Sequence, residues 1–272
     1  MAEFTGAYFS EDITYKEISL FKANTFNDGV VLYEVLRIYN ETVLFLEDHL
    51  QRLQESVRLS GYPYTVSVPV IHYILKDLIR RNGLHSGNVK IVLHFKADCP
   101  PVLYTYFIPH AYPTPAMYKE GVETDLLAAV RLKPNVKRLL PEVLQRASEF
   151  IRAENLYEAL LVDADETITE GSKANVFFIQ GESVYTPPAD RVLKGITRGK
   201  IIQLCNQLNF RLIEQSISIN SLHGFDAAFL TGTSPKVLPV RRIANFEYKV
   251  VNRVMNAIIA AYDDLIASYT EP

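Results

Sequence analysis

The stretch that decides the fold runs from residue 135 to residue 198 and contains three short motifs. They read Asn-Val-Lys at 135–137, Thr-Glu-Gly-Ser-Lys-Ala-Asn at 169–175, and Lys-Gly-Ile-Thr-Arg at 194–198. The first supplies an amine, the second a carboxylate at the end of a strand, and the third a glycine turn that opens a helix with free N–H groups. Each motif alone is common, so the prediction depends on their order and spacing.

Patterns upstream of these motifs predict a first α+β layer. Apolar and polar residues alternate over 33–39 and 42–46, which is typical of a β-hairpin with Asn40-Glu41 at its turn. Apolar residues then recur at helical spacing in two segments, one ended by Gly61 and the other by Gly83. Two more strands are predicted, at 89–95 and 102–108.

The sequence pattern changes after residue 112, and this change predicts two domains. Pro113 and Pro115 favour an extended linker, and a new series of short strands and helices follows it. Thr197 is expected to cap one of these helices. The predicted parts are an N-terminal α+β domain at 1–112, a linker at 113–122, and a C-terminal domain at 123–272 that carries Lys137.

Composition excludes several other classes of protein. The 272 residues include 48% hydrophobic and 22% charged side chains, the balance of a globular protein with a sizeable core. A net charge of −3 gives no field that would favour nucleic acid or an anionic membrane. The two cysteines are isolated, the six histidines lack metal-ligand spacing, and no apolar window approaches about 18 residues. Without a signal-peptide pattern either, we expect a cytoplasmic protein with no metal, nucleic-acid or membrane partner.

Lys137, Glu170 and Asn175 are the first candidate functional residues. Taken one at a time, a loop lysine and a turn carboxylate are usually solvated surface groups. Lys137, however, lies between a strand and a helix that opens at Pro141, where an amine can be held over a cleft. Glu170 ends a predicted strand and can point inward, and Asn175 follows closely enough to orient it. Pyridoxal phosphate needs such an amine for its aldehyde and such a carboxylate for its pyridinium nitrogen.

A phosphate group needs hydrogen-bond donors and a cation, and three segments can supply them. Ile196 and Thr197 open a predicted helix, whose N-terminus presents N–H groups and the positive end of the helix dipole. Thr233 and Ser234 form a turn after an apolar strand and offer further donors. Arg52 lies off the apolar face of its helix, and the guanidinium group binds phosphate best.

Together these features resemble the class IV aminotransferases, the fold-type IV pyridoxal phosphate enzymes. The chain has, in the family's order, Asp-His-x-x-Arg at 48–52, Lys137, Glu-Gly-x-x-x-Asn at 170–175, Gly-Ile-Thr at 195–197 and Gly-Thr at 232–233. The resemblance spans roughly residues 26–243. It implies an α+β fold with a small N-terminal α/β sandwich and a larger C-terminal barrel-like domain, assembled as a homodimer.

The resemblance also implies a role for each matching residue. Lys137 would be the catalytic residue, forming a Schiff base with pyridoxal 5′-phosphate and moving the α-proton of the substrate. The cofactor-binding residues would be Arg52, Glu170, Asn175, Leu193, Ile196, Thr197 and Thr233. The candidate substrate-binding residues would be Tyr33, Lys90 and Ser234.

The chain departs from the family's patterns at positions that bear on the substrate. Val31-Leu32 reads as an insertion before Tyr33. Phe95 stands where the branch that acts on D-amino acids carries an arginine, and Glu142 stands where the branched-chain branch has a tyrosine. The identity and stereochemistry of the substrate are therefore left open.

Three functions fit the motifs. The favoured one is a transaminase that moves an amino group between an amino acid, branched-chain-like or other, and a 2-oxo acid. The alternative is a lyase of the aminodeoxychorismate lyase type, which releases pyruvate. The third is a non-catalytic protein that binds pyridoxal phosphate. A supply of oxo acid separates the first two, because only transamination requires it.

Overall fold

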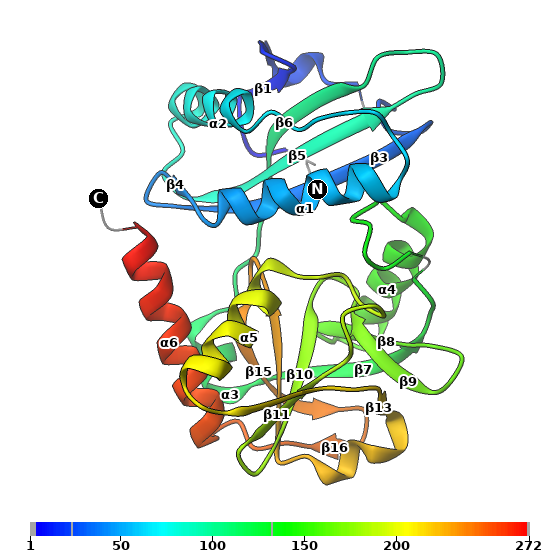
Figure 1. Cartoon of the computed structure of the whole chain (residues 1–272), viewed down its shortest axis with the longest axis vertical. Helices are drawn as coiled ribbons and strands as arrows, with labels where there is room; N and C mark the ends of the chain where they lie inside the picture. Colours follow the sequence, from blue (N-terminus) through cyan, green and yellow to red (C-terminus); the bar gives the residue numbers. More distant parts are fainter. Residues whose placement is uncertain (1–3, 23, 132, 271–272) are drawn as a thin grey trace. The chain divides into compact units, whose positions relative to one another are not determined.

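The computed structural model describes residues 4–22, 24–131 and 133–270. These residues divide into two compact units. The first contains the residues up to Ala111, the segment Val136–Leu139 and the residues from Tyr269 onward, and the second contains Tyr112–Asn135 and Leu140–Ser268. Each unit combines a β-sheet with helices (Figure 1), so the expected α+β class is confirmed.

The first unit is built on a six-stranded antiparallel sheet with the strand order β2-β1-β6-β5-β3-β4. The strands are β1 (Tyr8–Glu11), β2 (Thr14–Glu17), β3 (Val30–Tyr39), β4 (Thr42–Val43), β5 (Gly87–Phe95) and β6 (Val102–Ile108). The helices are η1 (Ile18–Leu20), α1 (Leu46–Leu59) and α2 (Val68–Asn82). Helices α1 and α2 both pack on the sheet (Figure 1).

The helical spacing of apolar residues explains how α1 and α2 bury one face of this sheet. Leu50 of α1 and Ile74 of α2 lie in the same buried cluster as Leu36 of β3. Helix α2 stops at Gly83, which adopts a left-handed conformation with φ +58°, as the sequence predicts. Helix α1 ends two residues before the predicted stop at Gly61.

The predicted hairpin is present, and its turn residues explain its geometry. Asn40 and Glu41 both have positive φ, 48° and 63°, as a tight two-residue hairpin turn requires. Strand β3 pairs with β5 in one unbroken register, from Val30 opposite Phe95 to Ile38 opposite Gly87. The register is therefore regular through Val31-Leu32, and no bulge marks those residues.

The opposite face of the sheet is covered by an aromatic cluster. Phe21, for example, lies within 6 Å of the rings of Phe9, Tyr104 and Tyr106, mostly in tilted or edge-to-face geometry. The buried members are Phe9, Val31, Val92 and Tyr106, and the partly buried ones are Phe4, Ile18, Phe21, Phe26, Tyr33, Tyr104, Ile108 and Leu139. The segment that carries Lys137 thus packs on this face through Leu139.

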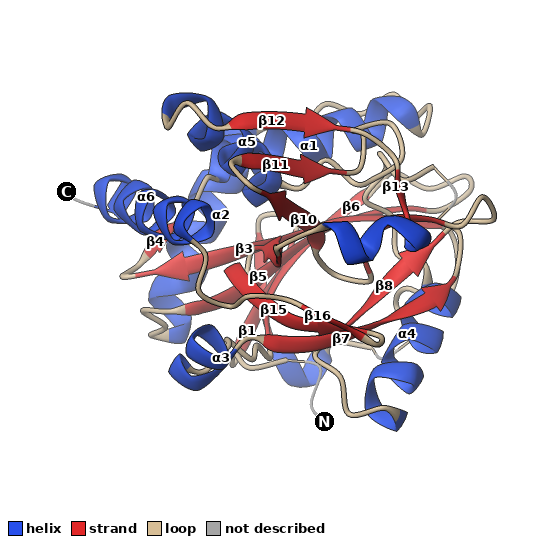
Figure 2. Cartoon of the chain, turned by 90° about the horizontal axis from the view of Figure 1, so that it is seen from below, coloured by secondary structure: helices blue, strands red, loops and turns tan. Residues whose placement is uncertain are grey.

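The second unit is built on a ten-stranded mixed sheet. Its strand order is β12-β11-β10-β14-β15-β7-β8-β9-β13, with β16 paired to β15. The strands are β7 (Val122–Ala128), β8 (Glu158–Val162), β9 (Thr167–Gly171), β10 (Asn175–Gln180), β11 (Ser183–Thr186), β12 (Arg211–Glu214), β13 (Ile217–Ser218), β14 (Ala227–Gly232), β15 (Lys236–Ile243) and β16 (Phe246–Glu247). The helices are α3 (Pro115–Glu120), α4 (Pro141–Ala153), α5 (Ile196–Gln207), η2 (Ile219–Gly224) and α6 (Arg253–Thr270). The sheet curves into a half-barrel (Figure 2), which confirms the expected barrel-like form.

Two features of the chain's path differ from the predicted domain boundaries. The predicted linker contains a short helix, α3, whose first turn is capped by the Thr114 hydroxyl, which accepts a hydrogen bond from the Met117 N–H. The segment Val136–Leu139, expected in the C-terminal domain, belongs to the first unit. The reason is backbone pairing, because Tyr33 N–H donates to Lys137 O and Leu139 N–H to Val31 O, each at 3.1 Å.

Candidate functional site

Backbone hydrogen bonds in the first unit fix the position of Lys137. Besides the pairing with β3, the Lys137 N–H donates to the Ser56 hydroxyl of α1 at 3.2 Å, and the adjacent Val136 is buried in the core. The Lys137 Nζ lies 5.0 Å from the centroid of the Tyr33 ring. The Nζ of Lys90 lies 4.9 Å from the same centroid, so two of the predicted site lysines contact one aromatic ring.

Arg52 of α1 is held by a buried carboxylate in the same unit. Its Nε donates to Glu34 Oε1 at 2.8 Å and its Nη2 to Glu34 Oε2 at 2.5 Å. His49, one helical turn earlier, contacts Glu34 Oε2 through Nδ1 at 2.7 Å. Because a carboxylate can only accept, His49 Nδ1 is the donor. The guanidinium is therefore gripped in a bidentate pair with a fixed orientation.

The charge state of this triad follows from its burial and its partners. Burial alone would raise the pKa of Glu34, but the Arg52 guanidinium and the bond from His49 outweigh it and hold that pKa at about 2. Burial lowers the pKa of His49, against the opposite effect of Glu34. An ionised Glu34 paired with a cationic Arg52 and a neutral His49 is the arrangement that these shifts favour.

Glu170 of the second unit is the centre of a buried polar cluster, which we call the Glu170 cluster. It consists of Glu170, Arg131, Asn175 and Leu193. The Glu170 side chain accepts a bond from Arg131 Nη1 at 3.1 Å on Oε1, and from the Leu193 N–H at 3.0 Å on Oε2. Asn175 Nδ2 lies 3.3 Å from the same Oε2 and donates to the Leu193 carbonyl at 2.9 Å. Sequence reasoning found three of these residues and missed Arg131.

The N-terminus of α5 lies beside the Glu170 cluster. Gly195 occupies the N-cap position, and a Cβ built there would come within 2.1 Å of Asn175 Oδ1, so this close approach requires glycine. No side chain caps the helix, and its first turn contains no acidic residue. The first N–H groups of a helix lack intrahelical acceptors, so this terminus suits an anion.

The predicted capping role of Thr197 is wrong. Thr197 is the second residue of α5 rather than its N-cap, and its buried hydroxyl lies 3.4 Å from the Tyr262 hydroxyl of α6. The helix begins two residues earlier than predicted, because the Gly195 carbonyl already accepts its first i to i+4 hydrogen bond, from the Gly199 N–H at 2.9 Å. Ile196 and Thr197 thus contribute the first N–H groups of the helix.

The end of β14 adds hydroxyl groups next to Asn175. Asn175 of β10 is the direct partner of Thr231 of β14, so their side chains share one face of the sheet. The Thr231 hydroxyl is fully buried and has no hydrogen-bond partner within the described parts of the chain. Thr233 and Ser234 follow in the turn between β14 and β15. A buried hydroxyl of this kind suits a polar ligand.

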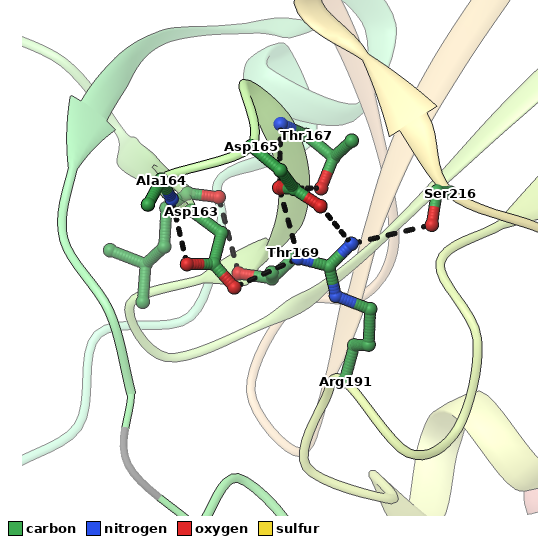
Figure 3. Close-up of polar contacts among 8 residues, drawn as sticks. Asp163, Ala164, Asp165, Thr167, Thr169, Arg191 and Ser216 are labelled. Atoms are coloured by element: carbon green, nitrogen blue, oxygen red, sulfur yellow. Dashed lines mark hydrogen bonds and ion pairs between the residues drawn. The ribbon is translucent and has the colours of Figure 1, made fainter.

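A second feature missed by sequence reasoning orders the loop that precedes α5. Arg191 bridges the turn between β8 and β9 (Figure 3), with Nη2 at 2.8 Å from Asp163 Oδ2 and Nη1 at 2.8 Å from Asp165 Oδ2. The Arg191 guanidinium lowers the pKa of both carboxyls. Because Arg191 lies two residues before Leu193, this bridge fixes the loop that presents Leu193 to Glu170.

The predicted site residues therefore gather into two sets. Within the second unit the structure brings together the Glu170 cluster, the start of α5 and the end of β14. Within the first unit it brings Lys137, Tyr33 and Lys90 together and holds Arg52 on Glu34. Residues 4–22, 24–131 and 133–270 contain no group of three His, Cys, Asp or Glu side chains arranged as metal ligands. Over the same residues, no helix has the length and hydropathy of a membrane span.

Comparison with known proteins identifies relatives of this chain. The family model described as amino-transferase class IV matches residues 31–243. A D-alanine aminotransferase from Bacillus licheniformis is 29% identical over 232 residues, covering 80% of each chain. A branched-chain-amino-acid aminotransferase from Escherichia coli strain K12 is 27% identical over 240 residues, covering 79% of this chain and 76% of the relative.

Solved structures show the same fold. A structure of branched-chain amino acid aminotransferase from Escherichia coli superposes with a TM-score of 0.86 at 23% identity, covering 98% of this chain and 97% of that one. A structure described as a candidate 4-amino-4-deoxychorismate lyase from Legionella pneumophila gives a TM-score of 0.78 at 23% identity, covering 87% and 91%. The expected fold-type IV architecture is confirmed by these superpositions.

Proposed function

The chain belongs to the class IV amino-transferases, and from that premise we propose that Lys137 is its catalytic lysine and the Glu170 cluster its binding site for the cofactor ring. Enzymes of this family use pyridoxal 5′-phosphate and transfer an amino group between an amino acid and a 2-oxo acid. The observation that carries the proposal is the buried Glu170 carboxylate, which is held by three donors beside a helix N-terminus without a side-chain cap.

The residues of the second unit fit this cofactor. A carboxylate suits a protonated ring nitrogen, and the Arg131 guanidinium, 3.1 Å from Glu170, supplies a positive charge beside it. The amides of Ile196 and Thr197 suit the phosphate, with Thr233 as a further donor. The buried Thr231 hydroxyl, which has no hydrogen-bond partner among the described residues, supports a polar ligand at this place. Leu193 would pack on the ring.

When bound, pyridoxal phosphate supplies an electrophilic carbon and a ring that accepts the charge left when the α-proton of the substrate departs. Lys137 would hold the cofactor covalently until the amine of the substrate displaces it, and the freed Nζ amine would then be the group that accepts and returns that proton. The pairing with β3 and the bond to Ser56 keep the lysine backbone in place. Glu170 would pair with the protonated ring nitrogen, and Arg52, oriented by Glu34, would contribute a donor to the phosphate.

The experiment for this proposal is the visible absorption spectrum of the purified protein with pyridoxal phosphate, followed by borohydride treatment and peptide mapping. We expect a yellow protein that loses its colour on reduction, with the added pyridoxyl mass on Lys137. Lys137→Ala should abolish that covalent mass. Lys133→Ala is the matched control, because Lys133 is an exposed lysine of the same loop. A protein that stays colourless with added cofactor would contradict the proposal.

For the substrate, we propose an amino acid with an apolar side chain, branched-chain-like or similar, paired with a 2-oxo acid. What supports this is the aromatic face of the first unit around Tyr33 and the names of the branched-chain and D-alanine relatives. Lys90 is the candidate cation for a carboxylate, since its Nζ lies among the Tyr33 and Tyr106 rings. In the second unit, Ser234 is the candidate hydroxyl donor to the same substrate carboxylate. A panel of L- and D-amino acids with 2-oxoglutarate as acceptor tests this choice.

The lyase remains the second candidate function, because a candidate lyase shares the fold. Release of pyruvate from aminodeoxychorismate without added oxo acid would favour it, whereas strict dependence on an oxo acid favours the transaminase. A third possibility, a protein that binds the cofactor without catalysis, requires that Lys137→Ala leave every cellular function intact.

We further propose a cytoplasmic homodimer, on the strength of the family resemblance and the isolated cysteines. Light scattering would check the oligomeric state, and cell fractionation would check the location.

A further inference from the structure

A second buried carboxylate of the second unit, Glu158, lies on the strand next to Glu170. Glu158 is the first residue of β8 and is 4% exposed. Its Oε1 accepts bonds from the Ala159 N–H at 2.9 Å, the Ser172 N–H at 3.1 Å and the Ser172 hydroxyl at 2.6 Å. Its Oε2 accepts from the Lys173 N–H at 3.2 Å. One buried side chain thus receives four hydrogen bonds.

Three of these bonds come from the turn that joins β9 to β10. This turn is also closed on itself, since the Gly171 N–H donates to the Ala174 carbonyl at 2.7 Å. Space at 171 is tight, because a Cβ there would lie 3.0 Å from Glu158 Cγ and 3.1 Å from the Ala174 oxygen. The turn therefore packs closely against the Glu158 side chain and is hydrogen-bonded to it.

This turn is flanked by two residues of the Glu170 cluster, Glu170 and Asn175, whose side chains contact each other. Glu170 precedes Gly171, and Asn175 follows Ala174 and lies 3.3 Å from the Glu170 carboxylate. The separation of Glu170 and Asn175 is set by the three-residue turn between Gly171 and Asn175. Whatever fixes the turn fixes that separation.

We propose that Glu158 is a positioning residue for the cofactor ring: its carboxylate shapes the β9–β10 turn and so places Glu170 and Asn175. The inference rests on the proposed role of Glu170 at the ring nitrogen and extends it to a residue that does not itself touch the ring. Glu158 acts through Ser172 and Lys173 on the geometry of a neighbouring carboxylate.

The chemistry of the contacts selects a carboxylate at this position. All four partners are donors, and an ionised carboxylate is the side chain that only accepts. An amide of the same shape would turn an NH₂ group toward either the Lys173 N–H or the Ser172 donors. Burial raises the pKa of Glu158, while the bonds from Ser172 and the backbone oppose that rise. Without those bonds, burial of an ionised carboxylate at this position would be strongly unfavourable.

The test compares Glu158→Gln with Glu123→Gln, a carboxylate on the neighbouring strand β7 that pairs with Arg241 and Arg242 outside the Glu170 cluster. Two measurements are made on each: the affinity of the apoprotein for pyridoxal phosphate by equilibrium dialysis, and the pH midpoint at which the absorption of the bound cofactor changes. Loss of one bond to a charged group predicts about tenfold weaker cofactor binding for Glu158→Gln, together with a displaced midpoint. Glu123→Gln should match the wild type in both.

Each outcome decides a separate question. If Glu158→Gln and the wild type share affinity and midpoint, Glu158 has no positioning role and the inference is overturned, while the proposed function stands. If the wild type takes up no cofactor, the proposed function itself fails. Should Glu158→Gln not fold, Ser172→Ala replaces it, because it removes the 2.6 Å bond alone. A smaller change in the same direction supports the inference, and unchanged values overturn it.

Discussion

The buried pair of Glu34 and Arg52 links side-chain chemistry to stability at the residue scale. The Glu34 side chain is completely buried, and the Arg52 side chain is only 10% exposed. Water therefore cannot solvate either charge if its partner is removed. Removing one partner of such a pair leaves the other buried and uncompensated, which costs roughly 3–5 kcal/mol. The pair is therefore a source of both local rigidity and acid sensitivity.

We predict that stability falls with acid because of Glu34. Its folded pKa is about 2, below the ordinary value of 4.5, so its contribution is fully present above pH 4.5 and is lost as the pH falls toward 2. Urea unfolding followed across this range should show the loss. Glu34→Gln should be less stable near neutral pH and show a flatter acid dependence.

Glu55→Gln serves as the control for this prediction. Glu55 lies on the same helix and pairs with Arg58, but both side chains are well exposed. Its effect on the free energy of unfolding should stay within about 0.5 kcal/mol. An acid dependence of Glu34→Gln identical to that of the wild type would show that Glu34 does not carry the effect.

Residue-scale features were predictable where a motif contained them and hidden where the partners were distant. Glu170 and Asn175 lie in one motif, and their contact follows from the strand end. Arg131 contacts Glu170 from 39 residues away, and nothing in its local sequence indicates a partner. Likewise, Glu34 lies in the alternating stretch of the predicted hairpin, and that pattern does not show that its carboxylate would hold Arg52, 18 residues later.

Helix α5 shows at the element scale how two glycines of one helix serve different purposes. Gly195 abuts Asn175, whereas a Cβ at Gly199 would meet nothing within 4 Å. Thr197 looked like an N-cap because threonine caps helices well, but the glycine two residues earlier takes that position. Local propensity could not reveal this, since the choice depends on the packing of Gly195 against another strand.

The two glycines provide a matched pair of variants. Gly195→Ala should displace Asn175 or the start of α5 and weaken binding of pyridoxal phosphate. Gly199→Ala should leave binding unchanged and raise the free energy of unfolding by about 0.5–1 kcal/mol, because alanine is the better helix former. Dialysis of the cofactor and chemical denaturation measure the two effects. Equal cofactor affinity in both variants would contradict the role given to the α5 N-terminus.

At the scale of the whole molecule, the chain path was only partly predictable. The proline-rich stretch predicts a division near residue 112, and apolar periodicity located α1 and α2. The return of Val136–Leu139 to the first unit was not predictable, since four residues carry no strand pattern and their pairing with β3 depends on tertiary packing. The catalytic lysine proposed here thus belongs to one compact unit and the Glu170 cluster to the other.

This distribution predicts how the cofactor affects unfolding. A ligand that binds only the native chain stabilises it by about 2.7 kcal/mol at one hundred times its Kd. Because the proposed cofactor residues are divided between both units, that stabilisation should reach both. Calorimetry of the apoprotein should therefore show broader or separate transitions, which pyridoxal phosphate should sharpen and raise together. In Lys137→Ala the effect should shrink, since the covalent attachment in the first unit is lost. A cofactor-induced shift confined to part of the transition would mean that one unit alone binds it.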